Sequence, residues 1–358
     1  MEQGRVSAAA RDGGARGKGD VAVLFTCIGR RVSLLQSFRR AAGKLGLDAD
    51  FYGTDVSRLS PALQLCDRAF LVERTTHSEY ADQLLAIVRR HGVRLVVPTV
   101  DLDLRLLARH RPQFEALKCR VLISDPDVID TCLDKRRTFG FLRKNGFDTP
   151  ATTSVRAALA ADGRGQLRWP CFLKRWDGYA SQGNAVVHDP AEMRFFARRI
   201  PNAICQEFVE GTEYTCDVYV DFDRRVRCLV PRRRLEVRAG EVSKGQVVKH
   251  RAIMERGARL IELLGAGPGV ITLQLFVTSQ DQILFTEINP RFGGGVPLSI
   301  AAGADFPRWI LQELAGKRPR IAFDAFEDGL MMLRYDAEVW TRQSDLKGAK
   351  VDVPVVDR

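Results

Sequence analysis

Strand-like and helix-like segments alternate along the first third of the chain, and this alternation constrains the fold more than any other feature. The apolar run VAVLFT begins at Val21, and apolar residues then recur at helical spacing until Gly46 supplies a helix stop. The strand-like runs ADFYGTD, VRLVVPTVD and RVLIS follow, separated by helical patterns at 78–90 and 103–114. Because strands joined by helices run parallel, residues 20–125 are predicted to form a doubly wound parallel sheet.

Polar residues follow several of these strands. Ligands of such sheets bind beyond the carboxyl ends of the strands, which places Gly29, Arg30, Asp55 and Asp101 near a binding edge. The turn CIGRR lacks the pattern G-x-G-x-x-G, so it does not predict a dinucleotide site. Asp55 has two interpretations, a ribose contact and a helix cap, and we favour the cap.

The pattern changes after Asp134. A helix beginning at Lys135 leads to the hairpin WPCFLKRW and NAVVH, and a helix follows at 190–199. The strands AICQEFV, YTCDVYV, RCLVP and GQVVKH then come without helices between them, so this half is predicted to be mainly antiparallel. A helix at 252–264 precedes a last hairpin, GVITLQLFVT and QILFTEINP, and Asp305 caps a closing helix. The run GLMMLRY predicts one more strand.

The composition is that of an ordinary globular protein. The chain has 358 residues, of which 45% are hydrophobic and 28% charged, enough for about two or three domains. Residues 1–19 are rich in Gly, Ala and charge and are predicted to be a disordered tail. The absence of a long apolar run and of a signal peptide predicts a cytoplasmic protein without a membrane partner. The eight cysteines are predicted to be buried free thiols.

The formal net charge of +11 raises the question of a nucleic-acid partner. The basic residues are spread out, with one concentration, RRRLEVR at 232–238, and no basic stripe carries interleaved aromatic residues. Nucleic-acid binding is therefore disfavoured. A cleft for anionic substrates and a plain solvated surface both account for the surplus charge.

The segment LFTEINPRFGGG combines several polar groups at the end of an apolar strand. Glu287 and Asn289 are two residues apart and share one face of the strand. A hairpin turn at 279–282 would place Gln274 opposite Glu287, so that three oxygen donors converge. Mg²⁺ bound to a nucleotide uses few protein ligands of this kind. A strand that merely ends in a polar turn is the simpler alternative.

Cationic and glycine-rich positions lie near this hairpin in the predicted fold. Arg291 follows Asn289 by two residues, where its planar guanidinium could reach a phosphoryl oxygen. The glycines at 293–295 form either an anion-binding nest or a flexible turn. Lys174 ends a buried-looking strand, where an unpaired ammonium needs an anion, and the loop DGYASQG faces it.

Four ordered segments carry a family resemblance: DKRRTFGFLRKNGFDTP, CFLKRWDGYASQGNAVV, CQEFVEGTEYTCDVYV, and GVITLQLFV followed by FTEINPRFGGG. They resemble ATP-grasp ligases related to the large subunit of carbamoyl phosphate synthetase. The resemblance covers nearly the whole folded chain and implies a fold of the α/β and α+β classes. A Rossmann-like pre-ATP-grasp domain at 20–125 would precede a two-lobed ATP-grasp domain at 126–320. The small lobe would lie at about 150–210, and residues 321–358 would form a C-terminal extension.

The resemblance also implies roles for individual residues. Lys135 and Lys174 would contact ATP phosphates, and Ser181 to Gly183 would belong to the loop that closes over them. Residues Gln206, Glu207, Phe208 and Val209 would form the adenine hinge, and Glu213 would hold the ribose. Gln274, Glu287 and Asn289 match the family's ligands for Mg²⁺, with Mn²⁺ as an alternative ion. Arg291 and Lys174 would be the catalytic residues, Arg291 as stabiliser of an acyl phosphate.

The implied function is that of an ATP-dependent carboxylate–amine ligase that acts through an acyl phosphate and releases ADP and phosphate. Its partners would be a small carboxylic acid, such as an amino acid, and an amine, and a homodimer is compatible with this function. A non-amine acceptor and a non-catalytic ATP-binding regulatory protein are the alternatives. The loop DGYASQG has fewer glycines than in many relatives, and the chain lacks a glutaminase triad and a second synthetase half. The residues that could receive a substrate carboxylate are Arg232, Arg233, Arg234, Arg238, Lys244 and Lys249.

Overall fold

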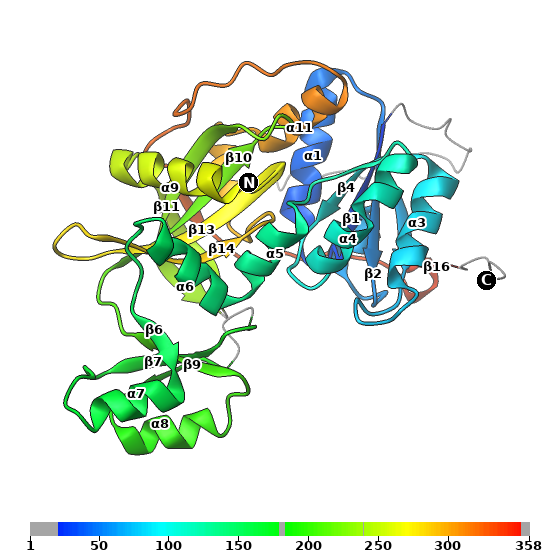
Figure 1. The fold of residues 1–358 in the computed structure, drawn as a ribbon. Helices are drawn as coiled ribbons and strands as arrows, with labels where there is room; N and C mark the ends of the chain where they lie inside the picture. Colours follow the sequence, from blue (N-terminus) through cyan, green and yellow to red (C-terminus); the bar gives the residue numbers. More distant parts are fainter. Residues whose placement is uncertain (1–20, 179–182, 239, 352–358) are drawn as a thin grey trace, which may run out of the picture.

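The computed structural model describes residues 21–178, 183–238 and 240–351, which form three sheets (Figure 1). In the first sheet the strand order is β16-β3-β2-β1-β4-β5, and neighbouring strands run parallel. Its main elements are β1 (Val21–Thr26), α1 (Val32–Leu45), β2 (Ala49–Asp55), α2 (Pro61–Leu65), β3 (Arg68–Leu71), α3 (Tyr80–His91), β4 (Val93–Pro98), α4 (Leu104–Ala116) and β5 (Arg120–Val121). The predicted doubly wound parallel sheet is confirmed, while α2 and β3 were not predicted from the sequence.

Helix α1 connects this sheet to the rest of the molecule. Its apolar residues are buried in one core with residues of the second sheet, whereas α3 and α4 pack in a separate core on the other face. Phe38 on α1 contacts Phe25 and Phe51 of the first sheet and also Phe292, with ring centroids 6.0 Å apart in the last pair. Aromatic packing of this kind joins the two sheets next to the end of β14.

The second sheet is antiparallel and has the order β14-β13-β10-β11-β12-β15. Its strands are β10 (Thr212–Val220), β11 (Val226–Arg238), β12 (Glu241–Val247), β13 (Gly269–Val277), β14 (Ile283–Asn289) and β15 (Met331–Leu333). Helix α9 (Arg251–Leu264) packs on β11, while α5 (Pro126–Leu133) and α6 (Lys135–Lys144) lie against β14. The short α10 (Val296–Ala301) and α11 (Phe306–Leu314) contact α1.

The third sheet stands apart from the other two at the lower left of Figure 1. It has the order β6-β9-β7-β8, with β6 (Thr152–Ser154), β7 (Cys171–Arg175), β8 (Ala185–Val187) and β9 (Ala203–Glu207). Helices α7 (Val155–Asp162) and α8 (Pro190–Ala197) cover it, with a small core of their own. The predicted hairpin of β7 and β8 is confirmed.

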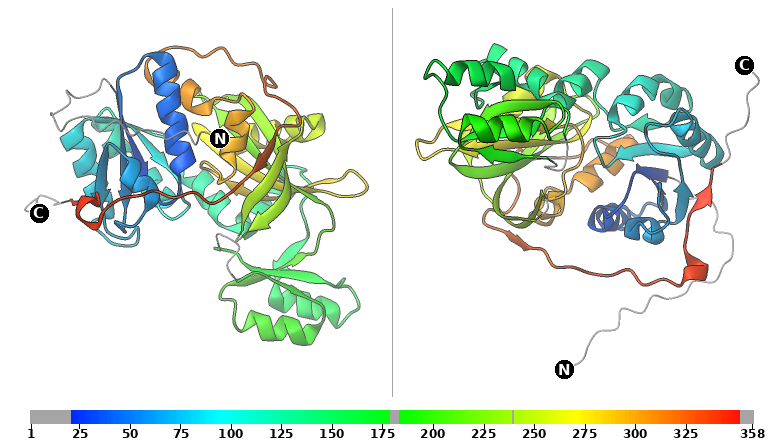
Figure 2. Two further views of the ribbon diagram at one scale, coloured as in Figure 1. Left: turned by 180° about the vertical axis from the view of Figure 1, so that it is seen from behind. Right: turned by 90° about the horizontal axis from the view of Figure 1, so that it is seen from below.

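The C-terminal segment runs back across the molecule (Figure 2). It contains β15, the additional strand that the sequence predicted, which pairs with β12 at the edge of the second sheet. The segment then continues through a 3-10 turn (Gln343–Asp345) to β16 (Ala349–Lys350). Strand β16 pairs with β3 in the first sheet, a contact that was not predicted from the sequence. The segment therefore touches both sheets, and the predicted domain boundaries stay predictions.

Two further expectations can be compared with the structure. Asp55 does not cap a helix: its carboxylate accepts hydrogen bonds from the backbone N–H groups of Gly29 and Ser57, which lie in loops. All eight cysteines are free, and all but Cys27 are buried. Among the described residues, no helix has both the length and the apolar character needed to cross a bilayer. The tail at 1–19 lies outside the described residues, and the cytoplasmic location stays a prediction.

Candidate active site

A cleft of about 610 Å³ opens where the three sheets meet, and we call it the central cleft. Its walls come from the loops after β1 and β4, from β7 and β9 of the small sheet, and from β10 to β14 of the second sheet. Among its lining residues are the predicted Lys135, Lys174, Gln206, Glu207, Phe208, Val209, Glu213, Gln274, Glu287, Asn289 and Arg291. Gly183 is exposed before β8 and does not line the cleft, and Ser181 lies outside the described residues.

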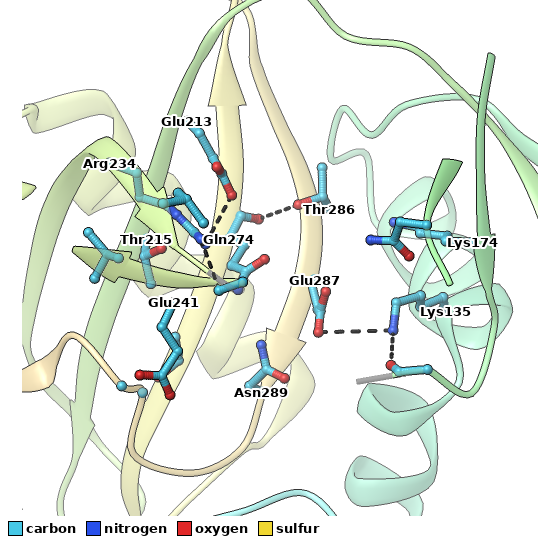
Figure 3. Close-up of a pocket in the computed structure, with 18 of the residues that line it drawn as sticks. Lys135, Lys174, Glu213, Thr215, Arg234, Glu241, Gln274, Thr286, Glu287 and Asn289 are labelled. Atoms are coloured by element: carbon cyan, nitrogen blue, oxygen red, sulfur yellow. Dashed lines mark hydrogen bonds and ion pairs between the residues drawn. The ribbon is translucent and has the colours of Figure 1, made fainter. Parts of the chain in front are cut away.

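The three predicted metal ligands lie together on the β13–β14 hairpin (Figure 3). Gln274 is paired with Glu287, as predicted, and Thr272 with Asn289. Between this pair and the turn the register is shifted by one residue from the predicted one. Asn289 is buried, whereas the Glu287 side chain is 24% exposed and lies 4.0 Å from the Lys135 ammonium. Two amide oxygens and one carboxylate thus point into the cleft from neighbouring strands, a donor set of the hard type that Mg²⁺ prefers.

Lys174 and Lys135 face this hairpin from the opposite wall (Figure 3). Lys135 donates a hydrogen bond of 2.6 Å to the Gly178 carbonyl. Lys174 is only 6% exposed and has no hydrogen-bond or ion-pair partner in the described part of the chain. Burial, with a contribution from Lys135, lowers the pKa of Lys174 to about 8, although Glu287 acts in the opposite direction. A buried ammonium in this state is stabilised by an anion in the cleft.

Arg291 is held in place at the end of β14. Its Nη2 donates to Asp101 Oδ2 at 2.7 Å and, at 3.4 Å, to Asn289 Oδ1, while Nη1 donates to the Phe292 carbonyl at 3.3 Å. Its Nε is buried without a hydrogen-bond partner among the described residues. Burial lowers the pKa of Arg291, but the Asp101 carboxylate outweighs this effect and raises it. Arg291 is therefore a fixed cation that retains a donor.

The predicted adenine hinge lies at the end of β9. Gln206 is buried and donates from Nε2 to Thr152 Oγ1 at 2.9 Å. Glu207 is exposed, and its carboxylate accepts from the Ala151 N–H at 3.1 Å, so that group is already used in holding β6. Phe208 and Val209 line the cleft beside it. A role of the Glu207 side chain in reading adenine therefore stays a prediction.

The structure shows which of the six basic residues predicted as candidates for binding a substrate carboxylate line the central cleft. Arg232 and Arg234 line the central cleft, and the other four candidates (Arg233, Arg238, Lys244 and Lys249) are exposed outside it. Arg232 is 1% exposed and donates twice to Asp217, at 2.8 and 3.0 Å. Arg234 forms a 3.1 Å ion pair with Glu213, the predicted ribose residue. Burial raises the pKa of Glu213, and Arg234 opposes that effect.

The three glycines after Arg291 serve close packing. None of them has a positive φ, which argues against the predicted nest. Gly294 and Gly295 lie in a turn, in which the Val296 N–H donates to the Gly293 carbonyl at 3.3 Å. A Cβ on Gly295 would lie 2.1 Å from Arg232 Nη1, and one on Gly294 would lie 2.9 Å from Glu241 Oε1. Side chains of the cleft wall therefore pack directly against this stretch of backbone.

Several cleft residues were missed by sequence reasoning. Arg31 follows β1 and donates to the Thr99 carbonyl at 3.2 Å, and Glu241 begins β12 and pairs with Arg334 at 3.2 Å. Arg31 follows a strand and Glu241 begins one, and these positions were the sequence signal that could have identified them as cleft residues. Burial and the nearby charge of Arg291 lower the pKa of Arg31. The end of the cleft that lies away from β9 thus combines guanidinium and carboxylate groups.

Two family models match the chain. Residues 23–122 match the family described as PylC-like, N-terminal domain. Residues 199–336 match the family described as ATP-grasp in the biosynthetic pathway with Ter operon, and they include the hinge region and the β13–β14 hairpin. The chain therefore carries an ATP-grasp match in its second half, and its fold is that of the ATP-grasp structures described below. The predicted resemblance is confirmed, with a PylC-like domain as the part that precedes the ATP-grasp domain.

Solved structures agree with this fold assignment at low sequence identity. The ADP complex of N5-carboxyaminoimidazole synthetase from Staphylococcus aureus has a TM-score of 0.68 and 14% identity, covering 85% of this chain and 80% of that one. The biotin carboxylase domain of 2-oxoglutarate carboxylase from Hydrogenobacter thermophilus, with MgADP and bicarbonate, has a TM-score of 0.67, 14% identity, and coverages of 88% and 74%. The L-amino acid ligase from Bacillus licheniformis has a TM-score of 0.62, 18% identity, and coverages of 83% and 75%. No curated protein sequence matches the chain.

The residues of the central cleft fit the cofactors of this superfamily. ATP-grasp enzymes use ATP and Mg²⁺, as predicted for this chain. The buried Lys174 has no counter-ion among the described groups, and the three oxygen donors of the hairpin face it across the cleft. A nucleotide polyphosphate would supply the anion that the Lys174 ammonium needs. The three oxygen donors would be suitable ligands for a divalent cation.

Proposed function

We propose that this ATP-grasp protein is a carboxylate–amine ligase that activates a small carboxylic acid as an acyl phosphate and releases ADP and phosphate. The observation that carries the proposal is the buried Lys174, which has no hydrogen-bond or ion-pair partner among the described residues and faces Gln274, Glu287 and Asn289 across one cleft. A polyphosphate and its metal ion fit between these groups, and Arg291 stands at the end of the same hairpin.

The nucleotide would lie between the small sheet and the second sheet. Gln206 to Val209 would take the adenine, Glu213 the ribose, and Lys135 and Lys174 the phosphates. Gln274, Glu287 and Asn289 would hold Mg²⁺, which when bound supplies charge neutralisation of the phosphate oxygens. Glu213 is already oriented by Arg234, so its carboxylate is fixed before a ligand arrives.

The chain's own contribution to the chemistry is electrostatic. Lys174 sits in a poorly hydrated wall, where its positive charge acts strongly on a transferring phosphoryl group. Arg291 keeps one N–H without a hydrogen-bond partner in the part of the chain that the structure describes, and its guanidinium would stabilise the charge on the activated carboxylate. An amine would then attack the acyl carbon, with phosphate as the leaving group. No protein nucleophile is required for this sequence of steps.

The end of the cleft that lies away from the small sheet supports a proposal for the class of substrate. Guanidinium groups of Arg31, Arg232 and Arg291 gather there, and carboxylates of Asp101 and Glu241 lie among them. A small acid that carries both charges, such as an amino acid, is complementary to such a wall. The likeness to an L-amino acid ligase supports this class of substrate.

A hydroxylamine trap tests the proposal. The purified protein, MgATP and hydroxylamine would be incubated with each proteinogenic amino acid and with short mono- and dicarboxylic acids, and acyl hydroxamate would be measured with ferric chloride. We expect hydroxamate with at least one acid, in proportion to ADP formed. Hydroxamate with none of the acids, together with no binding of MgADP in calorimetry, would contradict the proposal.

A further inference from the structure

Asp101 and Arg291 form an ion pair between two separate sheets. Asp101 follows β4 of the first sheet, and Arg291 follows β14 of the second. Their side chains are each 14% exposed, and the Asp101 Oδ2 to Arg291 Nη2 distance is 2.7 Å. Both residues line the central cleft, so this contact between the sheets is part of the cleft wall.

The position of Asp101 follows from the topology of the first sheet. The strand order reverses direction at β1, which has β2 on one side and β4 on the other. The loops after β1 and β4 therefore separate and leave a crevice at this switch point. Arg31 comes from the first loop and Asp101 from the second, and the crevice opens into the central cleft.

The other contacts of the Arg291 guanidinium are weaker. Its hydrogen bonds to the Phe292 carbonyl and to Asn289 Oδ1 measure 3.3 and 3.4 Å, so Asp101 provides the shortest one. Arg31 carries a like charge and lies close to Arg291: burial and the charge of Arg291 both lower the pKa of Arg31. Without the Asp101 carboxylate, Arg291 would lose its main anchor and be repelled by Arg31.

A second ion pair between the same parts of the chain provides a comparison. Asp125 contacts Arg224 of the β10–β11 turn at 2.5 and 2.8 Å, with side chains 41% and 37% exposed. Neither residue lines the central cleft. This pair can hold the sheets together, but it cannot orient a group in the cleft. Variants of Asp101 and Asp125 therefore distinguish an effect on the orientation of Arg291 from an effect on the attachment of the two sheets.

We propose that Asp101 is a positioning residue that holds the Arg291 guanidinium in the direction required by the acyl phosphate. This inference rests on the proposed function. It makes the orientation of the arginine in the ATP-grasp domain dependent on the PylC-like N-terminal domain. Asp101 acts through one guanidinium nitrogen and leaves Nε of Arg291 without a partner among the described residues.

The test compares Asp101→Asn, Asp101→Glu and the control Asp125→Asn in the full chain. Turnover is measured as acyl hydroxamate formed from hydroxylamine and the acid identified in the hydroxylamine trap. Asp101→Asn should lower kcat about 10- to 100-fold and leave KM for ATP within about twofold, because a misdirected stabilising group affects the transition state. Asp101→Glu, which keeps the carboxylate, should retain more activity than Asp101→Asn. Asp125→Asn should lower the Tm and leave kcat unchanged.

A binding measurement provides a readout without turnover. MgADP with aluminium fluoride, a mimic of the transferring phosphoryl group, should raise the Tm of the wild type more than MgADP alone. Asp101→Asn should keep the MgADP shift and lose the additional one. Wild-type kcat in Asp101→Asn, or equal losses in the Asn and Glu variants, would overturn the inference. A wild type with neither hydroxamate nor a MgADP shift would instead contradict the proposed function itself.

Discussion

Glu287 is the one carboxylate among the three predicted metal ligands, so it makes the most direct residue-scale prediction. Glu287→Ala should lower turnover in the hydroxylamine assay at least about 100-fold, because an oriented charge at the reacting phosphate is lost. The Tm should change little, since the Glu287 side chain is 24% exposed. Glu236→Ala, which removes an exposed carboxylate on β11 paired with Lys244, is the matched control and should keep full activity. Comparable activity in the two variants would remove Glu287 from the site.

Lys174 predicts an unusual dependence of stability on pH. Its folded-state pKa of about 8 is below the ordinary value of 10.5, so the unfolded chain binds the extra proton between these two values. The cost of burying the charge is present below pH 8 and is relieved as the pH rises toward 10.5. The free energy of unfolding of ligand-free wild type, relative to Lys174→Met, should therefore increase across this window by up to about 3 kcal/mol.

Urea titrations of both proteins between pH 7 and 10 measure this difference. MgADP should abolish this increase in the relative stability of the wild type with pH, because a bound anion stabilises the charged lysine. Binding of MgADP to the wild type at pH 8 should take up a proton, detectable as a dependence of calorimetric heat on the buffer, and Lys174→Met should not show this uptake. A difference between the two proteins that stays flat with pH would mean that Lys174 is well hydrated.

At the scale of elements, the glycine stretch after β14 predicts a packing effect. In Gly295→Ala the new Cβ would lie 2.1 Å from Nη1 of Arg232, which cannot move freely because two hydrogen bonds tie it to Asp217. We expect a loss of about 1–3 kcal/mol in the free energy of unfolding. Gly140→Ala, in helix α6 with nothing within 4 Å of its Cβ, should instead gain up to about 1 kcal/mol. Chemical denaturation of both variants measures these free energies of unfolding. Similar changes at the two positions would contradict the predicted packing effect at Gly295.

The same scale shows what the sequence could predict. The pairing of Gln274 with Glu287 was predicted correctly, and the two-residue period explains why Glu287 and Asn289 share a face. The register shift between Gln274 and Leu275, at which Thr286 is the extra residue, was not predicted, because a turn position alone does not reveal a bulge. On β11 the period predicts that Arg232 and Arg234 share a face that Arg233 does not, but not which face meets the cleft. Short elements such as α2 and β3 carry too few residues for a periodic signal.

At the scale of the whole molecule, the limit of sequence reasoning is the docking of one sheet on another. The Asp101–Arg291 pair and the pairing of β16 with β3 join segments that are distant in the chain. Such contacts depend on how apolar faces of α1, α10 and α11 pack, and local patterns do not contain this information. Strand-end positions identified Asp101 as a candidate, but its partner emerged only from the assembled structure.

The arrangement of charge across the whole cleft predicts which phosphate bond is broken. Lys135, Glu287 and Arg291 lie at or near the β13–β14 hairpin, and Lys174 faces this hairpin from β7 of the small sheet. The hinge at 206–209 lies at the end of the neighbouring strand β9. An adenylating enzyme would need its charge stabilisation at the alpha phosphate, closer to the adenine. We therefore expect ADP and phosphate in equal amounts when the acid from the trap turns over. Anion-exchange chromatography should detect no AMP, and pyrophosphate in proportion to product would overturn both the mechanism and the role of Arg291.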